Sequence, residues 1–457
     1  MTEINPFVFR QYDIRGKVAQ DFPPEVVELL GRGYGTFLRR HDAKSCAISG
    51  DVRLTTPELV AAFKSGLLAC GIDVVDLGKL PTPVNYYSTY KLDVDAAVMV
   101  TGSHNPPEFN GFKLTLNRGP VFANSIQDIR ALIEKEDFET GKGTESAYDI
   151  REEYSTMLAE KIKLERPIRA LLDCGNGAGA LLAPEIFRKV GVELECLFCE
   201  PDGRFPNHHP DPTIEENLVD LQKGMRAGNF DIGLALDGDA DRIGAVDENG
   251  EIFWADILMA LFVPEVVQKG DQVIFDVKCS QALEEMIVRY GGEPLMTPTG
   301  HSILKKKMKD IKGKFAGELS GHIFFADEFF GFDDALYNGL RLIRLLSRTD
   351  RKLSDLLGDI PKYYSSPEVR LTCENDEEKF RIAAEATEYF KNQYDCITVD
   401  GIRVKFDQGW ALARASHTQP DITCRFEATS PERLAEIEAL VTNKLSEFGS
   451  LQKASGH

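Results

Sequence analysis

A serine and a histidine stand side by side in residues 101–106, Thr-Gly-Ser-His-Asn-Pro, directly after an apolar run at residues 96–100. The apolar run predicts a buried strand, and the Asn-Pro pair predicts that the chain leaves this strand through a loop. Ser103 and His104 are then expected at the carboxyl end of a strand, where open α/β sheets bind their ligands. A serine exposed on such a turn could act as a nucleophile or carry a phosphoryl group.

Three aspartates, Asp237, Asp239 and Asp241, alternate directly after the apolar run at residues 232–236. Carboxylates at this spacing converge on one hard cation if the loop curls, and Mg²⁺ is the natural ion where a phosphate supplies further oxygens. An EF-hand has a related spacing, but its sixth position requires glycine and holds Arg242 here. The remaining alternative is an acidic surface turn. We favour a metal site, because three clustered acids after a buried strand are unfavourable unless a cation neutralises them.

Two further loops carry polar groups suited to binding a phosphorylated sugar. Glu318, Ser320 and His322 alternate, so an extended loop would place them on one face, where they suit sugar hydroxyls. An ordinary polar turn is the alternative. The segment at residues 414–420 has the polar groups needed to form a phosphate-binding cradle. The alternative is a hairpin loop with one surface arginine. The polar side chains of this segment are Arg414, Ser416, His417 and Thr418.

Several single cationic or polar residues lie near these loops in the sequence. Lys113 follows the serine loop by ten residues and could return to it across a hairpin. Taken alone, each is more often a solvated surface residue, and the run Lys305–Lys307 predicts a solvated helix face. The other candidates are Tyr12, Arg15, Lys278 and His301.

A glycine-rich segment at residues 173–179 resembles a dinucleotide-binding turn, but its third glycine comes one residue early. A tight strand-to-helix turn explains it better.

The pair Cys196 and Cys199 has the spacing of a redox or zinc pair, yet no second pair accompanies it and the segment looks like a strand.

Composition limits the possible partners. The 457 residues are 43% hydrophobic and 28% charged, which is typical of a soluble globular protein. The formal net charge of −20 argues against nucleic acid or an anionic membrane as the main partner, although a local cationic pocket can still bind a small anion. No apolar run approaches the ~20 residues of a membrane span, and the first residues lack a signal-peptide pattern. We therefore expect a cytoplasmic protein. The nine scattered cysteines make a disulfide framework an unlikely design.

The elements that must position these loops alternate between short apolar strands and helical patterns over the first three-quarters of the chain. This alternation predicts βαβ units around mostly parallel sheets. One predicted helix covers residues 57–70, with Thr56 as its N-cap. Residues 361–367 predict a linker, and helices at 376–392 and 431–448 predict an α+β domain after it. Three similar units would suggest an internal repeat, but the sequence has no strict period. The predicted domains are residues 1–148, 149–252, 253–361 and 362–457.

Taken in order, these motifs resemble the α-D-phosphohexomutase superfamily, in particular its bacterial phosphomannomutase/phosphoglucomutase group. The resemblance runs from residues 9–16 to residues 414–420, and includes residues 205–210, 276–279 and 330–334. It implies three related α/β domains and a C-terminal α+β domain around a central cleft. It also implies an intramolecular phosphotransferase that interconverts hexose 1-phosphate and hexose 6-phosphate of mannose, glucose or both. The route would use a phosphoserine and a hexose 1,6-bisphosphate.

The resemblance also implies a role for each candidate residue. Ser103 would be the phosphoserine, and one Mg²⁺ would be bound by this phosphoserine together with Asp237, Asp239 and Asp241. Glu318, Ser320 and His322 would form a sugar loop, and Arg414, Ser416, His417 and Thr418 would hold the substrate phosphate. Tyr12, Arg15, Lys113, Arg242, Lys278 and His301 would line the site, with Lys113 or His301 as the acid or base. His417 stands where this group typically has Asn, and Leu319 where Met is usual.

The expected partners are phosphosugars, and the expected assembly is a monomer or a weak homodimer. Three other hypotheses stay open at this point. They are a metal-dependent sugar phosphatase, a catalytically silent sugar-phosphate binding module and a nucleotide-binding protein that uses residues 175–179.

Overall fold

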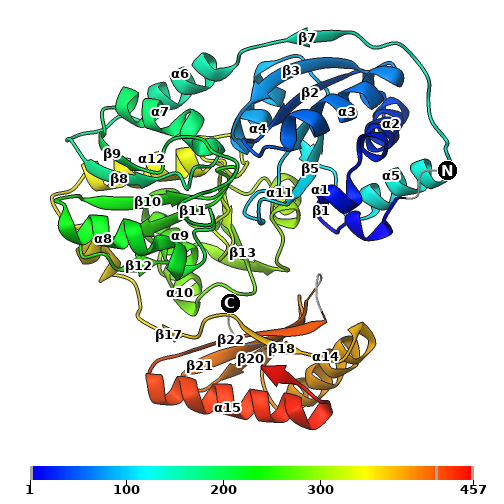
Figure 1. Cartoon of the computed structure of the whole chain (residues 1–457). Coiled ribbons are helices and arrows are strands. Elements are labelled where there is room, and N and C mark those ends of the chain that lie inside the picture. Colours follow the sequence, from blue (N-terminus) through cyan, green and yellow to red (C-terminus); the bar gives the residue numbers. More distant parts are fainter. Residues whose placement is uncertain (1–3, 417–419, 454–457) are drawn as a thin grey trace.

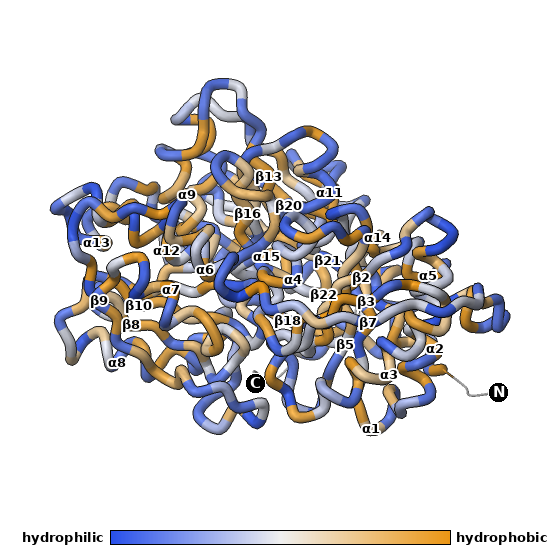
Figure 2. Tube along the Cα trace, turned by 90° about the horizontal axis from the view of Figure 1, so that it is seen from above, coloured by the Kyte–Doolittle hydropathy of each residue, from blue (hydrophilic) through white to orange (hydrophobic). Residues whose placement is uncertain are grey.

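The computed structural model describes residues 4–416 and 420–453 and contains four sheets, each with its own helices. Three mixed α/β domains lie together, and a fourth domain lies apart from the first at the end of the chain (Figure 1). This architecture confirms the predicted fold class of three α/β domains followed by an α+β domain. Figure 2 shows hydrophobic colours mostly along strands and inner helices, and hydrophilic colours mostly along outer loops.

Domain I holds the first sheet, in the order β1-β5-β4-β2-β3-β7 with β6 paired to β5. Its strands are β1 (Ile14–Lys17), β2 (Ser45–Gly50), β3 (Asp73–Lys79), β4 (Ala96–Val100), β5 (Phe109–Leu116), β6 (Gly119–Pro120) and β7 (Glu145–Ala147). Its helices are α1 (Val18–Asp21), α2 (Pro24–Arg40), α3 (Thr56–Ala69), α4 (Thr82–Lys91) and α5 (Asn124–Glu134).

Domain II holds the sheet β12-β11-β10-β8-β9, and domain III holds the sheet β14-β13-β15-β16. Domain II contains β8 (Arg169–Asp173), β9 (Glu193–Leu197), β10 (Ile232–Leu236), β11 (Ile243–Val246), β12 (Ile252–Phe253), α6 (Arg151–Lys161), α7 (Ala183–Val190) and α8 (Val219–Ala227). Domain III contains β13 (Gln272–Asp276), β14 (Glu293–Thr297), β15 (Phe315–Gly317), β16 (Ile323–Phe325), α9 (Ala255–Val266), α10 (Gln281–Arg289), α11 (His301–Ile311), α12 (Ala335–Ser347) and α13 (Leu353–Leu357).

Domain IV is an antiparallel sheet, β19-β20-β21-β22-β18-β23 with β17 paired to β22, together with two helices. Its strands are β17 (Tyr364–Ser365), β18 (Val369–Thr372), β19 (Cys396–Ile397), β20 (Ile402–Phe406), β21 (Gly409–Ala415), β22 (Asp421–Ala428) and β23 (Gln452–Lys453). Its helices are α14 (Asp376–Lys391) and α15 (Pro431–Phe448), close to the two predicted ranges. Asn375 and Ser430 cap them by accepting hydrogen bonds from the first-turn amides of Glu378 and Arg433.

The first three domains repeat one strand arrangement. In each sheet three neighbouring strands run parallel, and a fourth pairs antiparallel with the last of them: β3-β2-β4 with β5, β9-β8-β10 with β11, and β14-β13-β15 with β16. The serine loop, the aspartate loop and the Glu318 loop each connect the third strand of this set to the fourth. The three loops therefore occupy the same topological position in three domains, a repeat that the sequence does not reveal.

The hydrophobic clusters do not follow the division of the molecule into four sheets. One continuous cluster takes side chains from domains I, II and III, and α12, almost entirely buried, belongs to it. Domain IV has a separate cluster of its own, and a small cluster containing Val277, Trp410 and Leu412 joins it to domain III. The strand β4 is buried along its whole length, as expected for a strand covered on both faces.

Two local predictions were wrong. Thr56 does not cap α3, because it is the first residue of the helix and Thr55 holds the N-cap position; the Thr56 hydroxyl donates to Asp51 Oδ1 at 2.6 Å. The predicted linker at residues 361–367 is not free chain throughout, since Tyr364–Ser365 forms β17 on the edge of β22. The glycine-rich segment is the expected tight turn, running from β8 into a short 3-10 helix at Ala178–Leu181.

All nine cysteines are free. Within residues 4–416 and 420–453, no helix combines the length and the apolar composition needed to cross a membrane.

Candidate functional site

Ser103 is buried and has a strained backbone conformation. Ser103 is 2% exposed and has a φ of +49°, in a backbone region that residues other than glycine rarely adopt. The buried guanidinium of Arg53 fixes the loop by donating to four carbonyl oxygens, those of Ser103, Asn105, Pro106 and Phe109, at 2.5–3.1 Å. The turn that presents the serine is therefore set by a rigid cationic anchor beneath it.

Asp51 completes this anchor. Neither Asp51 nor Arg53 was predicted from the sequence to be a site residue. The Asp51 carboxylate accepts hydrogen bonds from the Thr101 hydroxyl at 2.8 Å and the Gly102 amide at 3.2 Å, and it lies 3.2 Å from Arg53 Nε. A usable signal existed, because Asp51 and Arg53 follow directly on β2, the strand that pairs with β4. Polar residues at the carboxyl ends of two neighbouring parallel strands meet at one edge of the sheet.

The aspartate loop of domain II meets the serine loop of domain I. Ser103 Oγ lies 3.1 Å from Asp237 Oδ2 and 3.1 Å from His104 Nδ1. Gly238 allows this approach, because a Cβ at its position would lie 2.3 Å from the Ser103 carbonyl oxygen. The two loops are thus packed backbone against backbone, and the serine hydroxyl faces the carboxylates.

The three aspartates converge as predicted, and their environment fits a bound cation. All three are fully buried, and their ligand oxygens lie within 4.8 Å of one another. Burial, and then the charges of Asp239 and Asp241, raise the pKa of Asp237 well above its ordinary value. Within the described chain, Asp239 Oδ1 and Asp241 Oδ1 have no hydrogen-bond partner. Such orphaned carboxylate oxygens are what a Mg²⁺ ion would satisfy.

Lys113 partly neutralises this cluster. Its ammonium lies 2.7 Å from Asp239 Oδ2 and in closer contact with Asp241. Burial alone would lower the pKa of Lys113, but the two carboxylates outweigh it and raise the pKa above its ordinary value. The predicted return of Lys113 across a hairpin has a structural basis, because Met99 on β4 pairs with Lys113 on β5.

In domain III, two histidines and a lysine surround the buried carboxylate of Asp333. Asp333 Oδ2 lies 2.8 Å from His322 Nδ1 and 3.6 Å from His301 Nδ1, and Asp333 Oδ1 accepts from Lys305 at 2.7 Å. The two imidazole rings stack with centroids 5.0 Å apart. Lys305 therefore does not belong to a solvated helix face, and that prediction was wrong for this residue. Sequence periodicity gives no sign that a lysine in a basic run turns inward.

The Glu318 loop is not extended, so the prediction that its three side chains share one face was wrong. Glu318 N donates to the His322 carbonyl at 2.9 Å, and Gly321 has a φ of +98°, which makes the segment a tight turn between β15 and β16. Ser320 donates to Glu318 Oε2 at 2.9 Å, whereas His322 faces Arg242, whose Nε lies 2.9 Å from His322 Nε2. Burial raises the pKa of Glu318.

Asp276, another residue missed as a site residue, supports this turn from the end of β13. Its carboxylate accepts from the Leu319 amide at 3.2 Å and from the Thr299 hydroxyl at 2.9 Å.

Hydrogen bonds link the remaining candidates across domains I, III and IV. Tyr12 Oη donates to the Thr299 carbonyl at 2.6 Å, and the Thr299 amide donates to Asp400 Oδ2 at 3.3 Å. Asp400 Oδ2 in turn lies 3.0 Å from Arg414 Nε. Arg414 thus joins the other loops through Asp400, a residue that no sequence motif singles out.

Three further candidates have partners near these loops. Lys278 lies 3.6 Å from Glu368 of domain IV, and Arg15 donates to Asp13 at 2.6 Å and to Asn105 at 3.3 Å. The Ser416 amide donates to the Asp421 carbonyl at 2.8 Å. His417 and Thr418 lie outside the described residues.

His208 bonds to Asp173 at the end of β8 and supplies a pH-dependent prediction. Its Nε2 lies 3.0 Å from Asp173 Oδ2 and its Nδ1 lies 2.9 Å from the His209 carbonyl, so the imidazolium form satisfies both oxygens. Burial lowers the pKa of His208, but the hydrogen bond and charge of Asp173 outweigh it and raise the pKa above 6.5. This stabilisation is full below pH 6.5 and is lost as the pH rises through the folded-state pKa.

We expect His208→Gln to lower the free energy of unfolding by on the order of 1 kcal/mol near pH 6 and by less near pH 9. Urea unfolding of both proteins at the two pH values measures this difference. An equal loss at both would contradict a charged His208.

Together, the fold and this site define a multidomain α/β enzyme. Four models of the phosphoglucomutase/phosphomannomutase family match the chain: α/β/α domain I at residues 6–140, domain II at 152–250, domain III at 254–364 and the C-terminal domain at 368–444. The chain therefore belongs to the phosphoglucomutase/phosphomannomutase family.

Individual relatives agree with this assignment over nearly the whole chain. A phosphomannomutase/phosphoglucomutase of Pseudomonas aeruginosa is 41% identical over 97% of this chain and 96% of its own length. A phosphoglucomutase of Neisseria gonorrhoeae is 38% identical over 96% of both chains. The crystal structure of a phosphoglucomutase/phosphomannomutase family protein from Burkholderia thailandensis has a TM-score of 0.93, with 39% identity over 98% of this chain and 100% of that one.

Proposed function

We propose that this protein interconverts hexose 1-phosphate and hexose 6-phosphate through a phosphoserine at Ser103 and a hexose 1,6-bisphosphate intermediate. The observation that carries the proposal is the position of the Ser103 hydroxyl, 3.1 Å from Asp237 in a buried cluster of three carboxylates. A hydroxyl placed against a cation site is suited to carry a phosphoryl group, whose transfer depends on charge neutralisation and positioning. The names of the relatives support the same class of reaction.

In the proposed first step, a sugar hydroxyl attacks the phosphorus on Ser103. The new P–O bond forms to the sugar as the P–Oγ bond breaks, and its electron pair returns to the Ser103 oxygen. Lys113 and Arg242 neutralise the oxygens of the transferring group. Asp237, Asp239 and Asp241 would hold Mg²⁺, which stabilises negative charge on phosphoryl and serine oxygens when bound.

In the proposed second step, the bisphosphate turns over and its other phosphate faces Ser103. The Ser103 oxygen attacks this phosphorus, the P–O bond to the sugar breaks, and the sugar oxygen takes back the proton removed in the first step. Each phosphate must then be able to occupy both the serine site and the cradle at Arg414. The cradle lies in domain IV, which has its own hydrophobic core and is connected through residues 361–367. We propose that this domain opens and closes over the turning intermediate.

His301 is the proposed base that accepts the proton of the attacking hydroxyl. Burial, and then the charge of Lys305, lower the pKa of His301 well below its ordinary value, so the ring is neutral at pH 7 and able to accept a proton. Lys113, held as an ammonium between two carboxylates, is suited to neutralise charge instead.

We expect His301→Asn to lower kcat by about 10²–10⁴-fold, the usual contribution of a general base, with little change in KM. Steady-state kinetics measure both constants, and intact-mass spectrometry should still find phosphate on Ser103. His41→Asn, which changes an exposed imidazole of domain I, is the matched control. Full activity of His301→Asn would exclude this role.

We propose that Glu318 binds sugar hydroxyls and that mannose and glucose phosphates are both substrates. One set of coupled assays with mannose, glucose and glucosamine 1-phosphates, run beside intact-mass detection of phosphate on Ser103, tests the function. Release of inorganic phosphate without the 6-phosphate product would indicate a phosphatase and overturn the proposal. The four domain ranges, the cytoplasmic location and the monomeric or weakly dimeric state stay predictions.

A further inference from the structure

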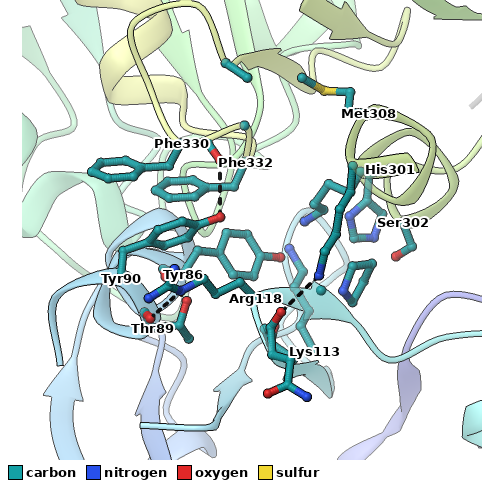
Figure 3. A pocket seen from close by; sticks show the side chains of 18 of the residues that line it. Tyr86, Thr89, Tyr90, Lys113, Arg118, His301, Ser302, Met308, Phe330 and Phe332 are labelled. Atoms are coloured by element: carbon teal, nitrogen blue, oxygen red, sulfur yellow. Dashed lines mark hydrogen bonds between the residues drawn. The ribbon is translucent and has the colours of Figure 1, made fainter. Parts of the chain in front are cut away.

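A cavity of about 600 Å³ lies between domains I and III (Figure 3). Its walls come from α4 and the β5–β6 hairpin on one side, and from α11 and residues 326–332 on the other. It borders the catalytic site at Tyr12, Lys113 and His301, whereas Ser103, the three aspartates and Arg414 do not line it. Its size and its position between domains are typical of small-molecule sites, which are about 300–1,000 Å³.

Four aromatic rings form the floor of this cavity. Tyr86, Tyr90, Phe330 and Phe332 gather on one side of it (Figure 3), with ring centroids 4.8 Å apart for Tyr90 and Phe330 and 5.7 Å apart for Tyr86 and Phe332. The Tyr90 hydroxyl already donates to the Phe330 carbonyl at 3.2 Å. Lys305 Nζ lies 4.0 Å from the centroid of the Tyr86 ring, so another ring would pack against the other three rings of the floor. It offers few groups to satisfy the hydroxyls of a sugar, and unsatisfied hydroxyls are costly to bury.

The charges around the cavity have one sign. Of the described residues that line it, five are Lys or Arg and none is Asp or Glu, in a chain with a formal net charge of −20. Lys113 and Lys305 are paired with the site aspartates. Arg118, Lys309 and Lys312 form no ion pair with any described carboxylate. Unpaired cations at the mouth of an apolar cavity favour an anionic ligand.

Arg118 is held in place at the mouth. Its Nε donates to the Thr89 carbonyl at 3.0 Å, and its guanidinium lies 4.8 Å from the centroid of the Tyr90 ring (Figure 3). Lys309 is tied across the domain boundary, because its ammonium donates to the Asn117 carbonyl at 3.1 Å. Planar guanidinium groups recognise phosphate and carboxylate through paired hydrogen bonds.

We propose that this cavity binds a small anion that carries a planar aromatic ring. The ring lies on the aromatic floor, and a phosphate or carboxylate group meets Arg118, Lys309 and Lys312. Such a ligand bridges domains I and III beside His301 and Lys305, so its binding is placed to affect catalysis.

Isothermal titration of the full chain with 1-naphthyl phosphate tests the proposal. We expect the Arg118→Ala, Lys309→Ala, Lys312→Ala triple variant to bind this probe at least about tenfold more weakly, because three charged contacts are lost. Lys306→Ala is the matched control, since Lys306 lies on the same helix but pairs with Asp310 and does not line the cavity. Inorganic phosphate, which lacks the ring, should bind at least about tenfold more weakly than 1-naphthyl phosphate.

The Arg414→Ala variant tests whether the probe binds in this cavity or in the catalytic cleft. Its affinity for the probe should equal that of the unchanged protein. Three results would overturn the proposal. They are unchanged binding by the triple variant, equal affinity for inorganic phosphate, and loss of probe binding in Arg414→Ala. Thermal unfolding of each variant shows that the compared proteins are folded.

Discussion

Replacing Ser103 with alanine is expected to lower the rate of hexose phosphate isomerisation by at least about 10⁴-fold, the scale seen when the nucleophile of a covalent mechanism is removed. The reason is the position of its hydroxyl: the other hydroxyl at this cluster, that of Thr82, donates to Asp239 and belongs to α4, not to the serine loop. Ser103 Oγ faces the carboxylate of Asp237, and the loop that carries it is fixed by Arg53 and Asp51. The side chain is small, so the loop should keep its conformation in the variant. A coupled assay measures the rate, and intact-mass spectrometry reports the loss of the phosphorylated species.

The matched control is Ser146→Ala, the same change on the exposed strand β7 of domain I. It should keep full activity and leave the phosphorylated species unchanged. If Ser103→Ala retained more than a small part of the activity, or still gained one phosphate from a hexose bisphosphate, the transferred group would have to reside elsewhere.

Asp239→Asn is expected to remove both the activity and the stabilisation of the fold by Mg²⁺. Asp239 is fully buried, with one carboxylate oxygen bonded to Lys113 and Thr82 and the other without a partner among the described residues. An amide keeps the shape but loses the charge that a hard cation needs. For the unchanged protein, Mg²⁺ at a hundredfold excess over its Kd should add about 2.7 kcal/mol to the free energy of unfolding. For the variant this gain should nearly vanish, and the rate should fall by at least about 10³-fold.

Thermal unfolding with EDTA and with saturating MgCl₂ measures the stabilisation separately from activity. Asp220→Asn, which changes an exposed carboxylate on α8 of the same domain, should behave like the unchanged protein. A Mg²⁺-dependent rise in Tm that survives in Asp239→Asn would show that the ion binds at another place.

The sequence by itself determined the elements and the loops between them. Runs such as residues 96–100 and 232–236 are buried strands, and polar loops follow both of them, because hydrophobic runs and turn residues act on their immediate neighbours in the chain. For the same reason α14 and α15 lie almost where they were predicted. The resemblance of the loops to a known family supplied the class of enzyme, which composition and periodicity alone do not give.

Only the tertiary structure decided which side chains meet. Ser103 and Asp237 are 134 residues apart, and they touch because two domains present the same topological loop to each other across a glycine. Asp333 and Lys305 turned inward, where the sequence showed only a basic run and an acidic pair. A buried ion pair and a solvated one have the same residue types, so burial and partners depend on packing between domains and not on local pattern.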